Sequence, residues 1–185
     1  GPKLNDPSSV YAESKRMSEV LCSVYYKRFG VPVKIARCFA FLGPYLPLDS
    51  HFAAGNFISN VLEGQDIVIN GDGSPQRSYM YPSDLMIWLW TILFKGDLNR
   101  PYNVGSDQPI SLKDLAEVIR HKSDNSNKIV IRVKNSLSEG ESNNRYIPSI
   151  ERASHNLGLS VYKSIDEIVI KTLEFNKNKN GLTTP

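Results

Sequence analysis

The chain has 185 residues, of which 41% are hydrophobic and 22% are charged, and its net charge at pH 7 is +3. This composition is ordinary for a globular protein, and so small a charge, without a clustered basic face, argues against nucleic-acid binding. Two cysteines, Cys22 and Cys38, are too few for a disulfide framework or a metal site, and no apolar run could cross a bilayer. We therefore expect a cytoplasmic protein without metal, nucleic-acid or membrane partners, in which both cysteines are small buried residues.

The first fifty residues follow the rhythm of a doubly wound α/β sheet. Apolar residues at spacings of three and four predict a helix over residues 10–29, which begins after capping serines and ends at Gly30. The β-branched, apolar residues 31–41 predict a buried strand that stops before Gly43 and Pro44. A helix, a short loop and a strand in this order lead us to expect that the chain begins in the middle of a βαβ unit.

The rest of the sequence predicts an alternation of helices and short strands. Helices are expected at 52–62, 82–95, 111–120 and 164–175, strands at 67–69, 77–81 and 129–133, and a polar loop at 136–144. Trp88 and Trp90 lie in the apolar second of these helices and are expected in the core. Gly71 and Gly73 predict a turn, because no strand–GxGxxG–helix context surrounds them.

Tyr11 and Lys15 stand four residues apart in Tyr-Ala-Glu-Ser-Lys, within the first predicted helix. This spacing places a phenol and an ammonium group on one helix face. A phenol with a reference pKa of ~10 is a poor acid or base at neutral pH, and a nearby cation favours its phenolate form. The pair could transfer a proton to or from a sugar hydroxyl, although two such residues also occur often on solvated helices.

Five segments resemble, in order and spacing, the motifs of the extended short-chain dehydrogenase/reductase family, and in particular its NAD-dependent nucleotide-sugar epimerases and dehydratases. The segments are YAESKRMSE at 11–19, ARCFAFLGP at 36–44, GNFI at 55–58, INGDGSPQRSYMY at 69–81 and YNVGS at 102–106. They are similar to the family's active-site helix, its Arg-x-Phe-Asn-x-Tyr-Gly-Pro segment, its Asn-Phe-Ile helix start, its Gly-Asp-Gly strand and its Tyr-Asn-x-Gly. The resemblance extends from Asp6 to about Phe175, which is nearly the whole chain.

The resemblance implies an α/β fold, in which the C-terminal part of a doubly wound Rossmann-like sheet joins a small α/β substrate-binding domain. Residues 1–50 would end the Rossmann-like NAD domain, and residues 51–185 would form mainly the substrate-binding domain, interwoven with Rossmann elements. It also implies NAD or NADP as cofactor, a nucleotide-diphosphate sugar as ligand and a homodimer as assembly. The glycine-rich NAD-binding turn and the Ser or Thr of the family's catalytic triad would both precede residue 1.

The resemblance assigns roles to five residues. Tyr11 would take a hydroxyl proton while a hydride leaves the sugar for NAD, and Lys15 would assist Tyr11 and hold the nicotinamide ribose. A diphosphate calls for bidentate, charge-assisted donors, for which Arg77 and Arg145 are the candidates. Asn56 could offer its amide, or the start of its helix, to a phosphate. Surface ion pairs for the arginines and a plain cap for Asn56 are the structural alternatives.

The sequence departs from the family pattern at two positions. Ala40 and Leu42 replace the Asn and the Tyr of the Arg-x-Phe-Asn-x-Tyr-Gly-Pro segment, so a polar contact to the ligand is lost or moved. Because the family's NAD-binding turn would precede residue 1 and the motifs do not distinguish the reactions, three alternatives to a complete epimerase or dehydratase stay open: a non-catalytic nucleotide-sugar-binding fragment, an NDP-4-keto-sugar reductase, or a subunit whose other half comes from a second polypeptide.

Overall fold

The computed structural model describes residues 7–48, 52–134 and 144–181. Its helices are η1 (Pro7–Ser9), α1 (Val10–Phe29), α2 (Ala53–Leu62), α3 (Pro82–Lys95), α4 (Leu112–Lys122), α5 (Glu151–Leu157) and α6 (Ile165–Gly181). Its strands are β1 (Ile35–Cys38), β2 (Ile67–Asn70), β3 (Gln76–Arg77), β4 (Pro101–Val104), β5 (Ile110–Ser111), β6 (Ile131–Lys134) and β7 (Arg145–Tyr146). The predicted α/β class is confirmed.

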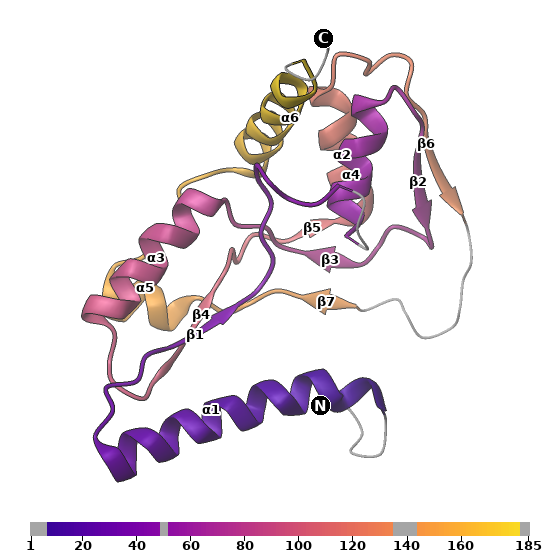
Figure 1. The fold of residues 1–185 in the computed structure, drawn as a ribbon. Helices are drawn as coiled ribbons and strands as arrows, with labels where there is room; N and C mark the ends of the chain where they lie inside the picture. The colour runs from indigo at the N-terminus through magenta and orange to yellow at the C-terminus, as the bar shows by residue number, and fades with distance from the viewer. Residues whose placement is uncertain (1–6, 49–51, 135–143, 182–185) are drawn as a thin grey trace.

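The strands form three small sheets (Figure 1). β1 pairs with β4 and β2 pairs with β6, both in parallel. Between them in Figure 1, β3 is flanked by β5, which is antiparallel to it, and by β7, which is parallel. Because β1 pairs with a strand more than sixty residues later in the chain, the first segment is interwoven with later elements, and the domain boundary near residue 50 stays a prediction.

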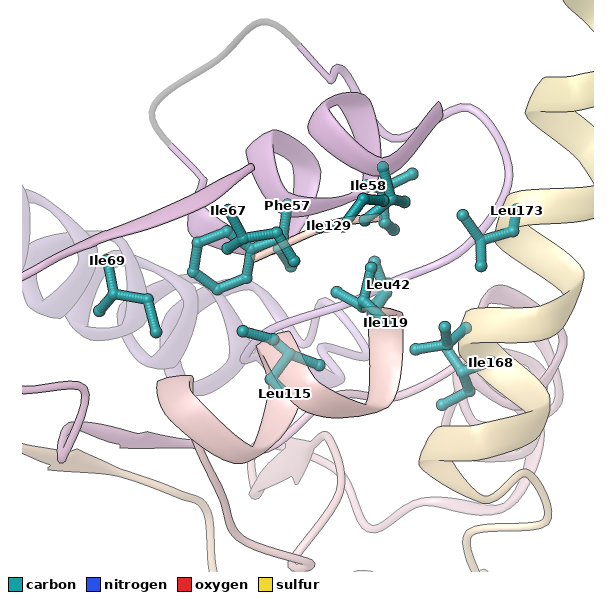
Figure 2. Close-up of a cluster of buried hydrophobic side chains, with 14 residues drawn as sticks. Leu42, Phe57, Ile58, Ile67, Ile69, Leu115, Ile119, Ile129, Ile168 and Leu173 are labelled. Atoms are coloured by element: carbon teal, nitrogen blue, oxygen red, sulfur yellow. The ribbon is translucent and has the colours of Figure 1, made fainter. Parts of the chain in front are cut away.

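The larger hydrophobic core lies between the β2 strand and three helices, α2, α4 and α6 (Figure 2). Ile58 from α2, Ile67 from β2 and Leu115 from α4 are completely buried there, and Ile168 contributes from α6. α2 can approach the preceding loop closely because Gly55 has no side chain: a Cβ at this position would lie 2.8 Å from the carbonyl oxygen of Pro47. This core supports the region that carries Asn56 and Arg77.

A second core joins the β1–β4 pair to α3 and α5. Tyr102 and Val104 of β4 pack there against Trp88 of α3. The buried carboxylate of Asp84, at the start of α3, accepts hydrogen bonds from the backbone N–H groups of Tyr162 and Lys163, at 2.9 and 3.1 Å. Asp84 therefore ties the start of α3 to the segment that precedes α6.

The β1 strand differs from the buried strand predicted over residues 31–41. It comprises only four residues, of which Ala36, Arg37 and Cys38 are exposed. The prediction that both cysteines are buried is therefore wrong, because Cys38 is exposed and Cys22 is only half-buried. The prediction for Trp90 is also wrong, because its side chain is 53% exposed and stacks on Phe94, with ring centroids 5.6 Å apart. Tyr102 and Val104 of β4 are buried with Trp88 of α3, whereas Cys38 lies on the neighbouring, exposed strand and Trp90, two residues after Trp88, points to the opposite side of α3.

Most of the other predicted elements are confirmed with small shifts of their ends, but the strand predicted at 77–81 shares only Arg77 with β3, and β4, β5 and β7 were not predicted. α1 has the predicted bounds, and Ser111 caps α4 as predicted, because its hydroxyl accepts from the backbone N–H of Asp114 at 3.0 Å. α6 extends to Gly181, six residues beyond the expected end, and the seven-residue α5 was not predicted. The loop predicted at 136–144 lies outside the described residues except for Asn144. Within the described part of the chain, no helix is both long and apolar enough to cross a membrane.

Candidate functional site

The N-terminal half of α1 presents Tyr11 and Lys15 together. The Nζ atom of Lys15 lies 5.4 Å from the centroid of the Tyr11 ring, as the four-residue spacing predicts. Tyr11 is 73% exposed, and Lys15 is exposed as well. The structure therefore brings the two candidate catalytic residues together and leaves the phenol accessible to a ligand.

Polar contacts attach α1 to the β1–β4 pair. The guanidinium of Arg37 on β1 donates through Nε and Nη2 to both carboxylate oxygens of Glu19, at 2.7 and 2.6 Å. The hydroxyl of Ser23 donates to Oδ1 of Asn99, just before β4, at 2.8 Å. An open cavity of about 450 Å³ lies between the helix and the two strands, and no residue of α1 is buried. The helix is thus held by a few directional contacts rather than by an apolar face.

The outer face of α1 is apolar. Its exposed side chains are Val10, Met17, Leu21, Tyr25 and Phe29, whereas Val20 and Val24, which are also exposed, line the cavity that faces β1 and β4. A surface helix normally turns its apolar stripe toward the core, so α1 shows the reverse arrangement. A contiguous apolar face of this kind is typical of a surface that another polypeptide covers.

Arg77 and Arg145 lie on neighbouring strands. In the parallel β3–β7 pair, Arg77 is opposite Tyr146 and Arg145 is opposite Gln76, one register step apart. Nη1 of Arg77 donates to the carbonyl oxygens of Gln76 and Asn144, both at 2.8 Å, which fixes the guanidinium near the start of β7. Because side chains alternate along a strand, the register directs the two arginines to opposite faces of this sheet.

Arg145 lines an open cavity of about 520 Å³ together with Asp107, Glu151 and His155. Arg77 is not among the residues that line it. The structure therefore brings the two arginines to one small sheet but not into one cavity. Asn56 is exposed in the first turn of α2, where its backbone N–H bonds to the carbonyl oxygen of Phe52 at 3.1 Å.

The residues that follow Arg77 combine polar groups with burial. Tyr79 lines a cavity of about 110 Å³ with Ser106 and Lys163, and burial raises the pKa of its phenol while the charge of Arg77 opposes that effect. Ser78 is buried, and its Oγ has no hydrogen-bond partner in the described part of the chain. Such an orphan hydroxyl is uncommon in a folded interior.

Sequence reasoning missed Glu19 and Arg37. The available signal was a single charged residue in the otherwise apolar β1 sequence Ile-Ala-Arg-Cys, together with Glu19 one helical turn beyond Lys15. The hydrogen bonds from Arg37 lower the pKa of Glu19, and those to Glu19 raise the pKa of Arg37. Among the described residues, no group of three or more His, Cys, Asp and Glu side chains is placed to hold a metal ion.

Residues 1–105 match the model of the NAD dependent epimerase/dehydratase family. The chain is 30% identical over 170 residues to UDP-glucuronic acid decarboxylase 1 of Xenopus tropicalis, which covers 91% of this chain and 39% of that protein. The curated relative is therefore more than twice as long as the matched segment.

Solved structures extend this likeness to the fold. Pal from Bacillus thuringiensis superposes with a TM-score of 0.79 and 28% identity, over 94% of this chain and 55% of that one. UDP-glucuronic acid 4-epimerase from Bacillus cereus, solved with UDP-glucuronic acid and NAD, superposes with a TM-score of 0.73 and 25% identity, over 91% of this chain and 52% of that one. The chain thus has the fold of about half of such an enzyme, and it belongs to the NAD-dependent epimerase/dehydratase family.

Proposed function

We propose that this chain supplies the acid–base pair and the nucleotide-sugar site of an NAD-dependent epimerase or dehydratase. The reaction would begin with oxidation of a sugar hydroxyl to a keto intermediate. The observation that carries this proposal is the contact between Tyr11 and Lys15 on the accessible N-terminal half of α1. Family membership alone would not assign these two side chains a role.

Tyr11 would act as the base that removes the proton from the sugar hydroxyl and later returns it. The Lys15 ammonium would stabilise the phenolate electrostatically as that proton moves. Both side chains are placed on a regular helix, which keeps their separation fixed while the substrate changes.

The cofactor is proposed to be NAD or NADP, which when bound supplies a hydride acceptor for the oxidised sugar carbon. The residues of this chain that fit it are Tyr11 and Lys15, whose polar groups could reach the nicotinamide ribose. The turn of Gly71 and Gly73 does not fit the pyrophosphate, because it joins β2 to β3 rather than a strand to a helix. Gly73 has a packing role instead, since a Cβ there would lie 3.0 Å from Cβ of Lys113.

The proposed substrate is a nucleotide-diphosphate sugar. Arg77 and Arg145 are its proposed diphosphate-binding residues, and Asn56 would contribute from the start of α2. Two relatives support a uridine nucleotide, because their names refer to UDP-glucuronic acid. The opposite orientation of the two arginine side chains leads us to expect that Arg77 and Arg145 contact different parts of the ligand rather than one phosphate.

A non-catalytic nucleotide-sugar-binding protein is the second candidate. The specific observation that favours it is the exposure of β1. Tyr11 and Lys15 lie on a helix that buries no residue and is attached to this exposed strand. The two candidates differ in whether Tyr11 matters for turnover.

The first prediction concerns Tyr11→Phe in the complete enzyme that contains this chain. Turnover should fall by ~10²–10⁴-fold while the affinity for nucleotide sugar stays nearly unchanged, because only the proton transfer is removed. Steady-state kinetics and calorimetry measure the two quantities. Tyr25→Phe, on the outer face of the same helix, is the matched control and should retain wild-type turnover. Wild-type turnover in Tyr11→Phe would exclude the catalytic role.

The second prediction concerns the diphosphate. Arg77→Ala should weaken UDP and UDP-sugar binding together by ~2–4 kcal/mol, and Arg77→Lys should recover only part of this loss because it lacks the bidentate fork. Isothermal titration calorimetry gives the affinities. Arg132→Ala serves as control, because Arg132 lies on the edge strand β6 and pairs only with Asp66 among the described residues. Equal affinities for Arg77→Ala and the wild type would remove Arg77 from the site.

The third prediction concerns assembly. We propose that the apolar outer face of α1 pairs with the same face of a second copy around a two-fold axis, as an isologous homodimer requires. Replacing Met17 and Leu21 with Glu should convert the complete enzyme to a monomer in analytical ultracentrifugation. A wild-type enzyme that stays monomeric at high concentration would contradict the proposal.

A further inference from the structure

Two polar contacts, both on one side of α1, hold the helix that carries Tyr11 and Lys15 in position. The first is the two-point bond between Glu19 and Arg37, with distances of 2.7 and 2.6 Å. A bidentate arginine–carboxylate pair fixes orientation as well as distance, because two parallel N–H···O bonds must form together. Glu19 lies one helical turn beyond Lys15 and two turns beyond Tyr11, which is ~6 and ~12 Å along the axis.

The second contact lies one further turn along α1. Ser23 donates to Asn99, whose backbone adopts the left-handed conformation with φ of 55°. Asparagine tolerates this conformation better than most residues. The backbone N–H of Asn99 also donates to the carbonyl oxygen of Val33 at 2.8 Å, so the turn before β4 is tied to the segment that leads into β1.

These two contacts reach α1 from different elements, β1 and the turn before β4. Two points on a rigid helix set its axial position and its rotation, and Tyr11 and Lys15 move with it. Apolar packing does not replace them, because no residue of α1 is buried and the apolar side chains that face the strands, Val20 and Val24, line an open cavity. Other charged groups around the contact, Arg16 and Lys27, line the same cavity and do not bond to Glu19.

We propose that Glu19 and Arg37 are positioning residues, which hold α1 so that the side chains of Tyr11 and Lys15 are correctly placed relative to the substrate. The inference rests on the proposed acid–base role of Tyr11 and Lys15. Neither Glu19 nor Arg37 would contact the substrate. Exposed ion pairs often contribute little to stability, so the expected effect is on the placement of one helix and not on the folding of the whole chain.

The first arm of the test uses the 185-residue chain and does not depend on activity. Glu19→Gln should accelerate amide hydrogen exchange in the first half of α1 by about three- to tenfold, because the helix loses its main attachment to β1 and opens locally more often. Exchange in α4, whose Leu115, Ala116 and Ile119 are buried, should be unchanged and reports on global folding. Glu13→Gln, which removes the weaker Glu13–Arg16 pair of the same helix (3.5 Å), is the matched control and should leave α1 exchange unchanged.

The second arm uses the complete, NAD-loaded enzyme. Glu19→Gln should reduce kcat at least tenfold with less than a threefold change in KM for the nucleotide sugar, whereas Glu13→Gln should change neither. Arg37→Lys keeps the positive charge but cannot form the bidentate hydrogen bonds, so its kcat should lie between those of the wild type and Glu19→Gln. The exchanged pair Glu19→Arg with Arg37→Glu should recover most of the lost kcat.

Two results would overturn the proposal. Unchanged exchange of α1 in Glu19→Gln would show that the pair does not hold the helix, whatever the enzyme's reaction. Faster exchange with unchanged kcat would show that the attachment does not position the acid–base pair. Failure of the proposed function is recognised separately, because it would appear as normal turnover in Tyr11→Phe.

Discussion

The parallel pairing of β1 with β4 is the constraint on which the placement of the candidate acid–base pair depends. Parallel strands are stable when helices cover both faces and neighbours occupy both edges. β4 meets this requirement on one face, where α3 and α5 bury Tyr102 and Val104. β1 does not meet it, because its residues Ala36 and Cys38 are exposed. The region that carries the candidate acid–base pair is therefore attached to a strand that is largely exposed.

The substrate side of the molecule is built differently. The core of α2, β2, α4 and α6 is closed without help from the β1–β4 pair, and it supports the strand that bears Arg77. Asp84 links the two parts through its bonds to the backbone at Tyr162 and Lys163. This division agrees with the proposed function. In that proposal the nucleotide sugar binds residues that the larger core supports, and the acid–base pair lies on a helix whose exposed outer face binds another polypeptide.

Local signals were sufficient to predict most elements. The bounds of α1 followed from apolar periodicity and Gly30, and the start of α4 followed from the Ser111–Asp114 cap, because these signals lie within a few residues of one another. The contact between Tyr11 and Lys15 was also local.

The errors at Cys38 and Trp90 have one cause: apolar sequence predicts burial, but burial depends on which partners cover the residue. The Glu19–Arg37 pair spans eighteen residues and two elements, and no local pattern encodes its geometry. The register that turns Arg77 and Arg145 to opposite faces depends on how two distant strands pair.

The central proposal is that this chain supplies the acid–base and nucleotide-sugar residues, and that its described residues do not form the binding site for the cofactor pyrophosphate. Tight NAD binding in doubly wound folds needs a glycine-rich turn between a strand and a helix, whereas the turn at Gly71 joins two strands. Calorimetric titration of NAD into the 185-residue chain tests the claim directly, with UDP titrated into the same sample as the control for a folded substrate site. The account predicts binding of UDP and no measurable binding of NAD. A dissociation constant for NAD in the micromolar range would contradict it.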